Sequence, residues 1–461
     1  MESNYIKLPT IEYYLYEMNN GMKLLLIPND DATIISYGTY INVGSLNESD
    51  DELGIAHFLE HMMFKGSKKY SGKSLINKLD ELGTSYNATT SFEYTEYEIH
   101  GLPQFHDELL SILLDMYFNP LIPPEDVENE RQIIIEEYNM RYDDKHLRQY
   151  LNLLKLVTQE KNKLYARPII GTKDSINKIT SNDLMNFRKN KYTPDKTTIT
   201  ISGNINLRYT LDNIIKTIKE LTGENITLNK INYKPNEYIN YNDDLFFDTK
   251  KHIYFNDRFI YEKYPAEQTI ITVSFPCWRS YNKNNHFIAI ITSLLTDGMS
   301  GRITKALRED NGMSYSQNAY LDTYNNFGLL NVTVGVNSNR IIDALKAILD
   351  VYIELYKNGI NDGELVKVKN LKLTGLMVFF QKQLSYFNYF TETIINGAKV
   401  ETLDDIVDKF NALNIDTINE IIRQIINPKQ MIVSIIGPNK PNVKKTFKLF
   451  NYFNKKLIHL S

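Results

Sequence analysis

The pattern of apolar and polar positions in the first part of the chain predicts strands that alternate with helices. Residues 21–28 are strongly apolar, and residues 33–45 largely alternate between apolar and polar, so both stretches are predicted as strands. Residues 73–82 have helical spacing and end at Gly83, a residue suited to a left-handed C-terminal cap. The Thr- and Tyr-rich stretch 86–101 is predicted as a strand pair.

Two further helices are predicted on either side of a proline-rich turn. Residues 105–120 have helical periodicity and stop at Pro120. Pro123 and Pro124 can open the next helix, because their missing N–H groups fall where helical donors have no partner. That helix continues through the acidic sequence EDVENERQIIIEEYNMRY, and a buried strand is predicted further on at 197–205.

An internal repeat divides the sequence into two similar halves. YTPDKTTITISGNI (192–205) is similar to INPKQMIVSIIGPN (426–439), at an offset of 234 positions (426 − 192). The same offset relates EYEIHGL (96–102) to LNVTVGV (330–336), which indicates duplication of one α/β unit. We therefore predict an α+β protein of two homologous α/β sandwich halves. The predicted boundaries are 1–222 for the first half, 223–249 for a polar linker and 250–461 for the second half.

The stretch GIAHFLEHMMFKGS (54–67) carries the strongest chemical signal. His57 and His61 are four residues apart, so both imidazoles leave one face of a helix about one turn apart and can bind a single ion. Glu60 lies between them in sequence and can reach a water molecule without being a ligand itself. His-x-x-Glu-His is the inverzincin order of a zinc motif. The spacing therefore predicts a metal-dependent hydrolytic site.

The repeat provides an internal control for this motif. At the offset of 234, the three polar positions of the motif correspond to Ile291, Leu294 and Leu295. The scaffold therefore accepts apolar residues there, and three buried polar groups without partners would cost several kcal/mol. This comparison favours a metal site over an incidental polar cluster.

A third protein ligand is expected, because catalytic zinc sites commonly use three protein ligands and leave a position for water. Glu130 and Glu137 share one face of the predicted acidic helix, since they are seven residues apart. Glu136 and Glu137 both follow three isoleucines, which indicates that this part of the helix is buried, and spacing alone leaves both as alternatives. The ordinary explanation of an acidic run is a solvated face. The glutamates of this helix are Glu125, Glu128, Glu130, Glu136 and Glu137.

HFLEHMMFKGS followed by ENERQIIIEEYNMRYDD resembles the pitrilysin/insulysin family of zinc peptidases, in its mitochondrial-processing-peptidase-like branch. YARPIIGTKDSI (165–176) and LTDGMSGRITKALREDNGMSYS (295–316) are also similar to this family, so the resemblance covers nearly the whole chain. In the family the third ligand lies 76 residues after the second histidine, which implies Glu137 (137 − 61 = 76) and one zinc ion per chain. Glu130 matches a supporting acidic residue of the family.

The resemblance also implies roles for residues outside the zinc motif. Glu60 would be the general base, and Arg308 with Tyr315, seven residues apart, would hold the scissile carbonyl and its developing oxyanion. The substrate would dock as an added strand on an exposed sheet edge, with main-chain contacts at Asn87 and Ala88. Without the resemblance, Asn87 is equally well explained as a turn residue.

The predicted function is that of a zinc-dependent metalloendopeptidase that hydrolyses peptides or unfolded, extended segments inside a closed chamber. The resemblance implies a homodimer in which Arg308 and Tyr315 of one subunit complete the zinc site of the other. The sequence lacks the long glycine-rich loop of the processing peptidase's noncatalytic subunit, since LTDGMSG is short. The alternative is a noncatalytic, core-protein-like structural or assembly subunit, which the intact set of site residues argues against.

Composition limits the partners. A net charge of −4 gives no reason to expect nucleic-acid binding. The only cysteine, Cys277, excludes an internal disulfide and fits a reducing compartment. No apolar run is long enough to span a bilayer, and the N-terminus has neither a signal nor a transit pattern. We therefore expect a cytoplasmic protein with neither nucleic acid nor a membrane as partner, which does not favour mitochondrial presequence processing as its task.

Overall fold

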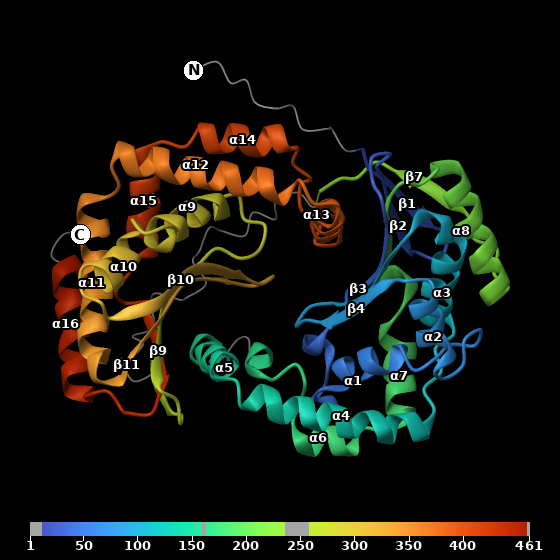
Figure 1. Cartoon of the computed structure of the whole chain (residues 1–461), viewed down its shortest axis with the longest axis horizontal. Coiled ribbons are helices and arrows are strands. Elements are labelled where there is room, and N and C mark those ends of the chain that lie inside the picture. Colours follow the sequence, from blue (N-terminus) through green and yellow to red (C-terminus); the bar gives the residue numbers. More distant parts are fainter. Residues whose placement is uncertain (1–11, 159–162, 236–257, 459–461) are drawn as a thin grey trace. The chain divides into compact units, whose positions relative to one another are not determined.

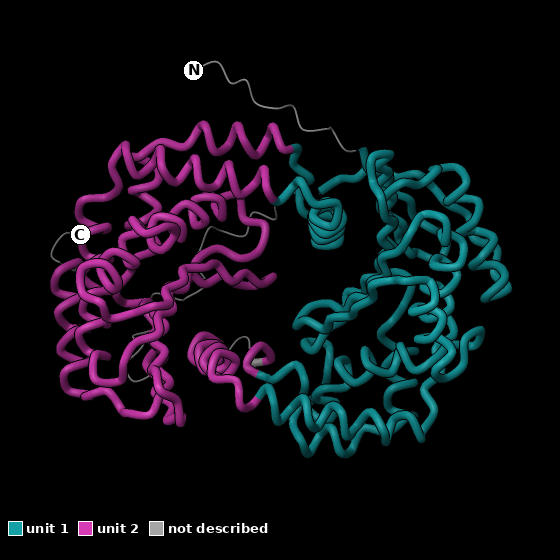
Figure 2. The backbone as a smooth tube through the Cα atoms, viewed as in Figure 1, with its two compact units in different colours: residues 1–141, 167–237, 379–402 teal, residues 142–166, 238–378, 403–461 magenta. Residues whose placement is uncertain are grey.

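The computed structural model describes residues 12–158, 163–235 and 258–458, in two compact units (Figure 1). Figure 2 shows that each unit includes a segment from the other half of the sequence. The sequence predicted two continuous halves, 1–222 and 250–461, and did not predict this exchange of segments between the units. Unit 1 consists of Met1–Arg141, Arg167–Glu237 and Phe379–Thr402, and unit 2 of Tyr142–Ala166, Tyr238–Val378 and Leu403–Ser461.

Within the described residues, unit 1 contains a seven-stranded mixed sheet with the strand order β4-β5-β3-β6-β2-β1-β7. β2 and β6 pair in parallel, whereas the other neighbours are antiparallel. β4 therefore lies at an edge of the sheet. The strands are β1 Tyr14–Met18, β2 Lys23–Pro28, β3 Ile35–Ile41, β4 Ser85–Thr90, β5 Thr95–Gly101, β6 Thr197–Gly203 and β7 Leu228–Ile231.

Both faces of this sheet are covered by helices. On one face an apolar core forms with helices α1, α3, α7 and α8, and it includes Phe58, Leu110 and Ile201. On the other face α13, from the exchanged C-terminal segment, packs Phe390 and Ile394 against apolar residues of β1 and β2. The helices are α1 Ile55–Met63, α2 Ser74–Glu81, α3 His106–Phe118, α4 Pro124–Tyr142, α6 Lys173–Lys178, α7 Ser181–Lys191, α8 Leu207–Thr222 and α13 Gln383–Ile395.

Unit 2 has a five-stranded sheet in its described residues, with the order β10-β11-β9-β12-β8. The exchanged helix α5 packs on it: Gln149 donates a hydrogen bond to the Ser434 carbonyl (2.7 Å), and Arg148 donates one to Glu262 on β8 (2.6 Å). The strands are β8 Phe259–Lys263, β9 Gln268–Cys277, β10 Ser314–Thr323, β11 Gly328–Asn337 and β12 Ile432–Gly437. The helices are α5 Lys145–Val157, α9 Asn285–Thr296, α10 Arg302–Thr304, η7 Lys305–Glu309, α11 Ile341–Asn358, α12 Asp362–Phe379, α14 Leu403–Asn411, α15 Ile415–Ile425 and α16 Val443–Ile458.

The internal repeat is visible in the strand order and register of the two sheets. The order β4-β5-β3-β6-β2 in unit 1 matches β10-β11-β9-β12-β8 in unit 2. Ser36 pairs with Ser202, and Ile270 pairs with Ile436; both partners are shifted by 234 (270 − 36 and 436 − 202). The predicted fold of two homologous α/β halves is therefore confirmed.

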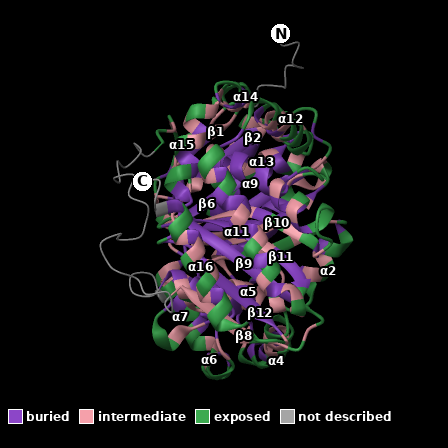
Figure 3. Ribbon diagram, turned by 90° about the vertical axis from the view of Figure 1, so that its left-hand side faces the viewer, coloured by how far each residue is buried: buried purple, intermediate pink, exposed green. Residues whose placement is uncertain are grey.

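The predicted linker, 223–249, is partly structured. β7 lies inside this range and joins the sheet of unit 1 by pairing with β1, because Leu228–Ile231 aligns with Leu15–Met18. Residues 236–249 lie outside the described residues. Figure 3 shows strands such as β9 and β11 largely buried, with exposed positions concentrated on helices. None of the helices in the described residues has the length and apolar character that crossing a membrane requires.

Candidate metal centre

Helix α1, which carries the histidine motif, is fixed at its first residues. It follows Gly54, whose φ of +87° is left-handed and which lies against Gly171, also left-handed at +81°. A Cβ at position 54 would lie 2.5 Å from the Ile170 carbonyl oxygen, so the close approach requires glycine. The Glu48 carboxyl oxygens accept hydrogen bonds from the backbone N–H groups of Gly54 and Ala56, both at 3.0 Å. These contacts fix the first turn of α1 and therefore the position of the histidine motif.

Glu48 is a site-supporting residue that the sequence analysis missed. Its side chain is buried, and burial raises the pKa of Glu48 to about 8, although the two backbone hydrogen bonds act in the opposite direction. A glutamate shortly before the predicted helix was the only available sequence signal. That signal is weak, because acidic residues near helix starts are common.

The structure brings His57, His61 and Glu137 together. Glu137 on α4 lies 3.6 Å from His57 Nε2 through Oε1 and 3.4 Å from His61 Nε2 through Oε2. One ligand atom from each residue lies within 4.8 Å of the others. Glu136 is exposed and is not part of this group. The geometry thus favours Glu137 over Glu136, as the family spacing implies.

Two imidazole nitrogens and one carboxylate form a donor set that suits zinc with an open coordination position. The residues therefore fit the ion that the motif predicts. His57 is buried and His61 is half-buried, so water access to both side chains is restricted. These three residues would hold the ion.

Glu130 supports His61 from the side away from the ligand group. Its Oε1 lies 2.9 Å from His61 Nδ1, and its other oxygen forms an ion pair with Lys65. This contact leaves His61 Nε2 directed towards Glu137. The supporting position predicted for Glu130 agrees with this geometry.

The glutamates of the site stabilise positive charge on the groups they contact. Burial lowers the pKa of His61, but hydrogen bonds with Glu130 and Glu137 outweigh it and raise that pKa to about 9. Burial raises the pKa of Glu137, but its hydrogen bonds with His57 and His61 hold it well below the usual range of a carboxyl group. Arg141 also donates a hydrogen bond to Glu137 Oε1 at 2.6 Å. Glu137 is therefore present as an anion, as a metal ligand must be.

Glu60 lies on α1, three residues after His57 and directly before His61. The Thr90 hydroxyl, at the end of β4, donates a hydrogen bond to Glu60 Oε2 at 2.6 Å. Asn87 and Ala88 also lie on β4, where they pair with Glu98 and Tyr97 of β5. No strand of the described residues pairs with the other side of β4. Asn87 is thus an edge-strand residue, and the alternative that it is a turn residue is wrong.

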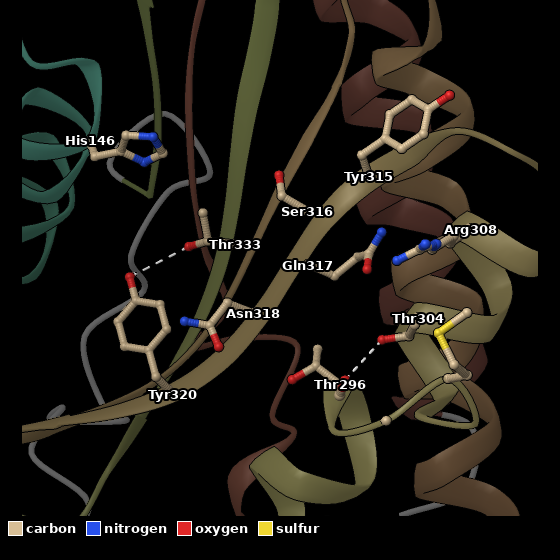
Figure 4. Close-up of a pocket in the computed structure, with 12 residues that line it drawn as sticks. His146, Thr296, Thr304, Arg308, Tyr315, Ser316, Gln317, Asn318, Tyr320 and Thr333 are labelled. Carbon is tan, nitrogen blue, oxygen red and sulfur yellow. Dashed lines mark hydrogen bonds between the residues drawn. The ribbon is translucent and has the colours of Figure 1, made fainter.

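Arg308 and Tyr315 lie in unit 2, where they line one pocket of about 500 Å³ (Figure 4). Arg308 comes from η7 and extends towards Gln317, whereas Tyr315 comes from β10 and points away from Arg308. Tyr315 is 85% exposed, and the Arg308 side chain is 44% exposed although its Nε lies 3.6 Å from Glu309 Oε1. Both side chains are therefore open to a ligand, and their proposed contact with substrate stays a prediction.

Comparisons with known proteins agree with the fold, and the names of relatives agree with zinc as the metal. Residues 24–173 match the family model described as Insulinase (Peptidase family M16), and residues 178–372 match that of the Peptidase M16 inactive domain. YmxG of Bacillus subtilis, named an uncharacterized zinc protease, is 27% identical over 92% of this chain and 98% of its own length. The uncharacterized zinc protease ML0855 of Mycobacterium leprae is 24% identical over 87% of this chain and 86% of its own.

Solved structures show the same fold. A protease from Helicobacter pylori superposes with a TM-score of 0.78 at 19% identity, covering 94% of this chain and all of that one. The first half of the periplasmic protease PqqL from Escherichia coli gives a TM-score of 0.75 at 18% identity, with 97% of each chain covered. A duplicated α/β scaffold with a His-His-Glu group defines the class as zinc-peptidase-like. The chain belongs to the peptidase M16 (insulinase/pitrilysin) family.

Proposed function

We propose that this protein is a zinc-dependent metalloendopeptidase that cleaves peptides or unfolded, extended polypeptide segments. The observation that carries the proposal is the convergence of His57 and His61 with Glu137 from a separate helix. It is supported by relatives named zinc proteases. The exposed edge of β4 supports an extended substrate, because a sheet edge can hydrogen-bond the main chain of any added strand.

The protein's own residues would act as follows. His57, His61 and Glu137 hold one zinc ion per chain, and zinc supplies Lewis-acid assistance to the scissile carbonyl and the attacking water when bound. Glu60 accepts a proton from that water and later returns it to the leaving nitrogen. The main chain at Asn87 and Ala88 aligns the substrate strand.

The Glu60→Gln variant tests this proposal. It should retain about one zinc per chain but lose peptide cleavage by roughly 10²–10⁴-fold, because glutamine cannot take the proton. Glu136→Gln is a matched control, since Glu136 neighbours Glu137 but is exposed and outside the ligand group. Zinc content by mass spectrometry and digestion of an unstructured peptide library provide the two readouts. A wild type that binds zinc but cleaves no peptide would instead favour the noncatalytic structural or assembly subunit.

We also propose that the protein acts as a homodimer enclosing a chamber, in which Arg308 and Tyr315 of one subunit complete the zinc site of the other. The exposure of both side chains in unit 2 supports contact with a bound peptide. Co-expressed Glu60→Gln and Arg308→Ala chains should recover activity that neither homodimer has, because one of the two mixed sites keeps both intact parts. Purification through two different tags isolates the mixed dimer, and absence of recovery would contradict completion in trans.

A further inference from the structure

Thr90 connects the edge strand to the catalytic helix. It is the last residue of β4, is 8% exposed, and its hydroxyl donates a hydrogen bond to Glu60 Oε2 at 2.6 Å. A threonine hydroxyl has one proton to donate, and here a carboxylate oxygen accepts it. Such a charge-assisted hydrogen bond is stronger than one between neutral groups.

Two contacts of β4 fix the position of Thr90. Side chains alternate along a strand, so Thr90 shares a face with Tyr86, whose ring packs 5.7 Å from that of Phe64 just after α1. Thr90 pairs directly with Thr95 on β5. The hydroxyl that contacts Glu60 is therefore held on a rigid part of the sheet.

We propose that Thr90 is a positioning residue that fixes the Glu60 carboxylate for its role as general base, an inference that rests on the proposed peptidase function. The hydrogen bond occupies Oε2 and leaves Oε1 to accept the proton of the attacking water. As the water oxygen bonds to the carbonyl carbon, its proton passes to Oε1. As the C–N bond breaks, that proton passes to the leaving nitrogen, and Thr90 keeps its own proton throughout.

The same strand would align both the substrate and the base. Asn87 and Ala88 precede Thr90 by three and two residues on β4. A peptide added to this edge is therefore held in a register that β4 sets, while Thr90 sets the carboxylate relative to the same backbone. Because misplacement of a catalytic group by about 1 Å can cost two orders of magnitude in rate, one rigid element serving both purposes is advantageous.

Two substitutions separate the effect of the Thr90 hydroxyl from that of the side-chain shape. Thr90→Val keeps the shape but removes the hydroxyl, and Thr90→Ser keeps the hydroxyl. Thr90→Val should lower kcat about tenfold with KM within about twofold and zinc content unchanged, whereas Thr90→Ser should restore most of kcat. Thr95→Val is the matched control: it removes a buried threonine hydroxyl from the paired position, but one that does not contact Glu60. In the Glu60→Gln background, Thr90→Val should produce no further loss.

Equal loss of kcat in Thr90→Val and Thr95→Val, or no rescue by serine, would overturn the positioning role. A wild type that cleaves no peptide would defeat the proposed function instead. Crystal structures of the wild type and Thr90→Val then decide the inference independently of activity. A Glu60 carboxylate that moves or becomes disordered in Thr90→Val supports the positioning role, and one that keeps its place refutes it.

Discussion

Helices α1 and α9 occupy equivalent positions in the two units but have opposite chemistry. Where α1 carries His57, Glu60 and His61, α9 carries Ile291, Leu294 and Leu295, all of which are buried in the core of unit 2. Helices α1 and α9 both pack in the core on one face of a sheet with the same strand order. The difference teaches that the scaffold does not need polar residues at these positions, so the polar set in unit 1 is explained by chemistry and not by folding.

The helix starts differ as well. α1 begins after left-handed Gly54, and Glu48 accepts hydrogen bonds from its first backbone N–H groups. In the repeat, Asn282 is the equivalent of Glu48 (282 − 48 = 234). The Asn282 side chain accepts a hydrogen bond from the Asn284 N–H at 2.9 Å. Unit 1 thus uses a buried ionisable group where unit 2 uses a neutral amide.

Making α1 resemble α9 has the largest expected effect. The triple variant His57→Ile, Glu60→Leu and His61→Leu should bind no zinc and lose activity by more than about ten-thousandfold, because the ligands and the base disappear together. The fold should persist, since Ile291, Leu294 and Leu295 are accommodated in unit 2. Zinc analysis, peptide cleavage and circular dichroism test this; an unfolded variant would show that the polar residues are structural.

Gly54→Ala should be the most destabilising single substitution among those considered. The added Cβ would meet the Ile170 carbonyl oxygen at 2.5 Å in a left-handed backbone conformation, for an expected cost of about 3 kcal/mol. Gly223→Ala is the control, because Gly223 has a φ of +77° but open space around it, and its cost should be only about 1 kcal/mol. Thermal unfolding of the two variants measures the difference, and equal melting temperatures would exclude the close contact with the Ile170 carbonyl oxygen as the cause.

Glu48 should make the stability of the protein depend on pH. The pKa of Glu48 is about 8 in the folded chain against 4.5 for an ordinary glutamate, so between these values the folded state keeps a proton that the unfolded state has released. Its contribution is therefore greatest below about pH 4.5 and falls as pH rises, by roughly 2 kcal/mol between pH 5 and pH 7. Urea unfolding at several pH values should show a smaller decline for Glu48→Gln, with exposed Glu220→Gln unchanged from wild type. Identical slopes in wild type and Glu48→Gln would count against this assignment.

Lys65→Met should have the smallest effect. Without its ion pair to Lys65, Glu130 orients His61 less firmly, so zinc affinity should fall about tenfold. Lys68→Met is the control, because Lys68 is exposed in the same loop. Competition with a chelating dye measures both affinities. If Lys65→Met and Lys68→Met bind zinc equally well, the contact with Glu130 has no influence on the metal.

The sequence predicted the local elements well where the hydrophobic periodicity agreed with the glycine and proline residues that end or begin an element. The helix expected at 73–82 is α2, and Gly83 has the left-handed φ of +64° expected of its cap. The hairpin predicted at 86–101 is β4 and β5, and the proline-led acidic helix is α4. Short-range spacing decides such elements, because helical hydrogen bonds close within four residues and the two strands of a hairpin are neighbours in the sequence.

By itself the sequence also determined the duplication and the chemistry of the motif, since the repeat offset and the His-x-x-Glu-His spacing can be read along the chain. It left the exchange of α5 and α13 between units, the support by Glu48 and the contact of Thr90 with Glu60 undetermined. The Thr90–Glu60 contact joins residues 30 positions apart, and the α13 contact between Gln383 and the Ile34 carbonyl joins residues 349 apart. Such contacts depend on how the sheet brings distant segments together, and neither periodicity nor composition encodes that information locally.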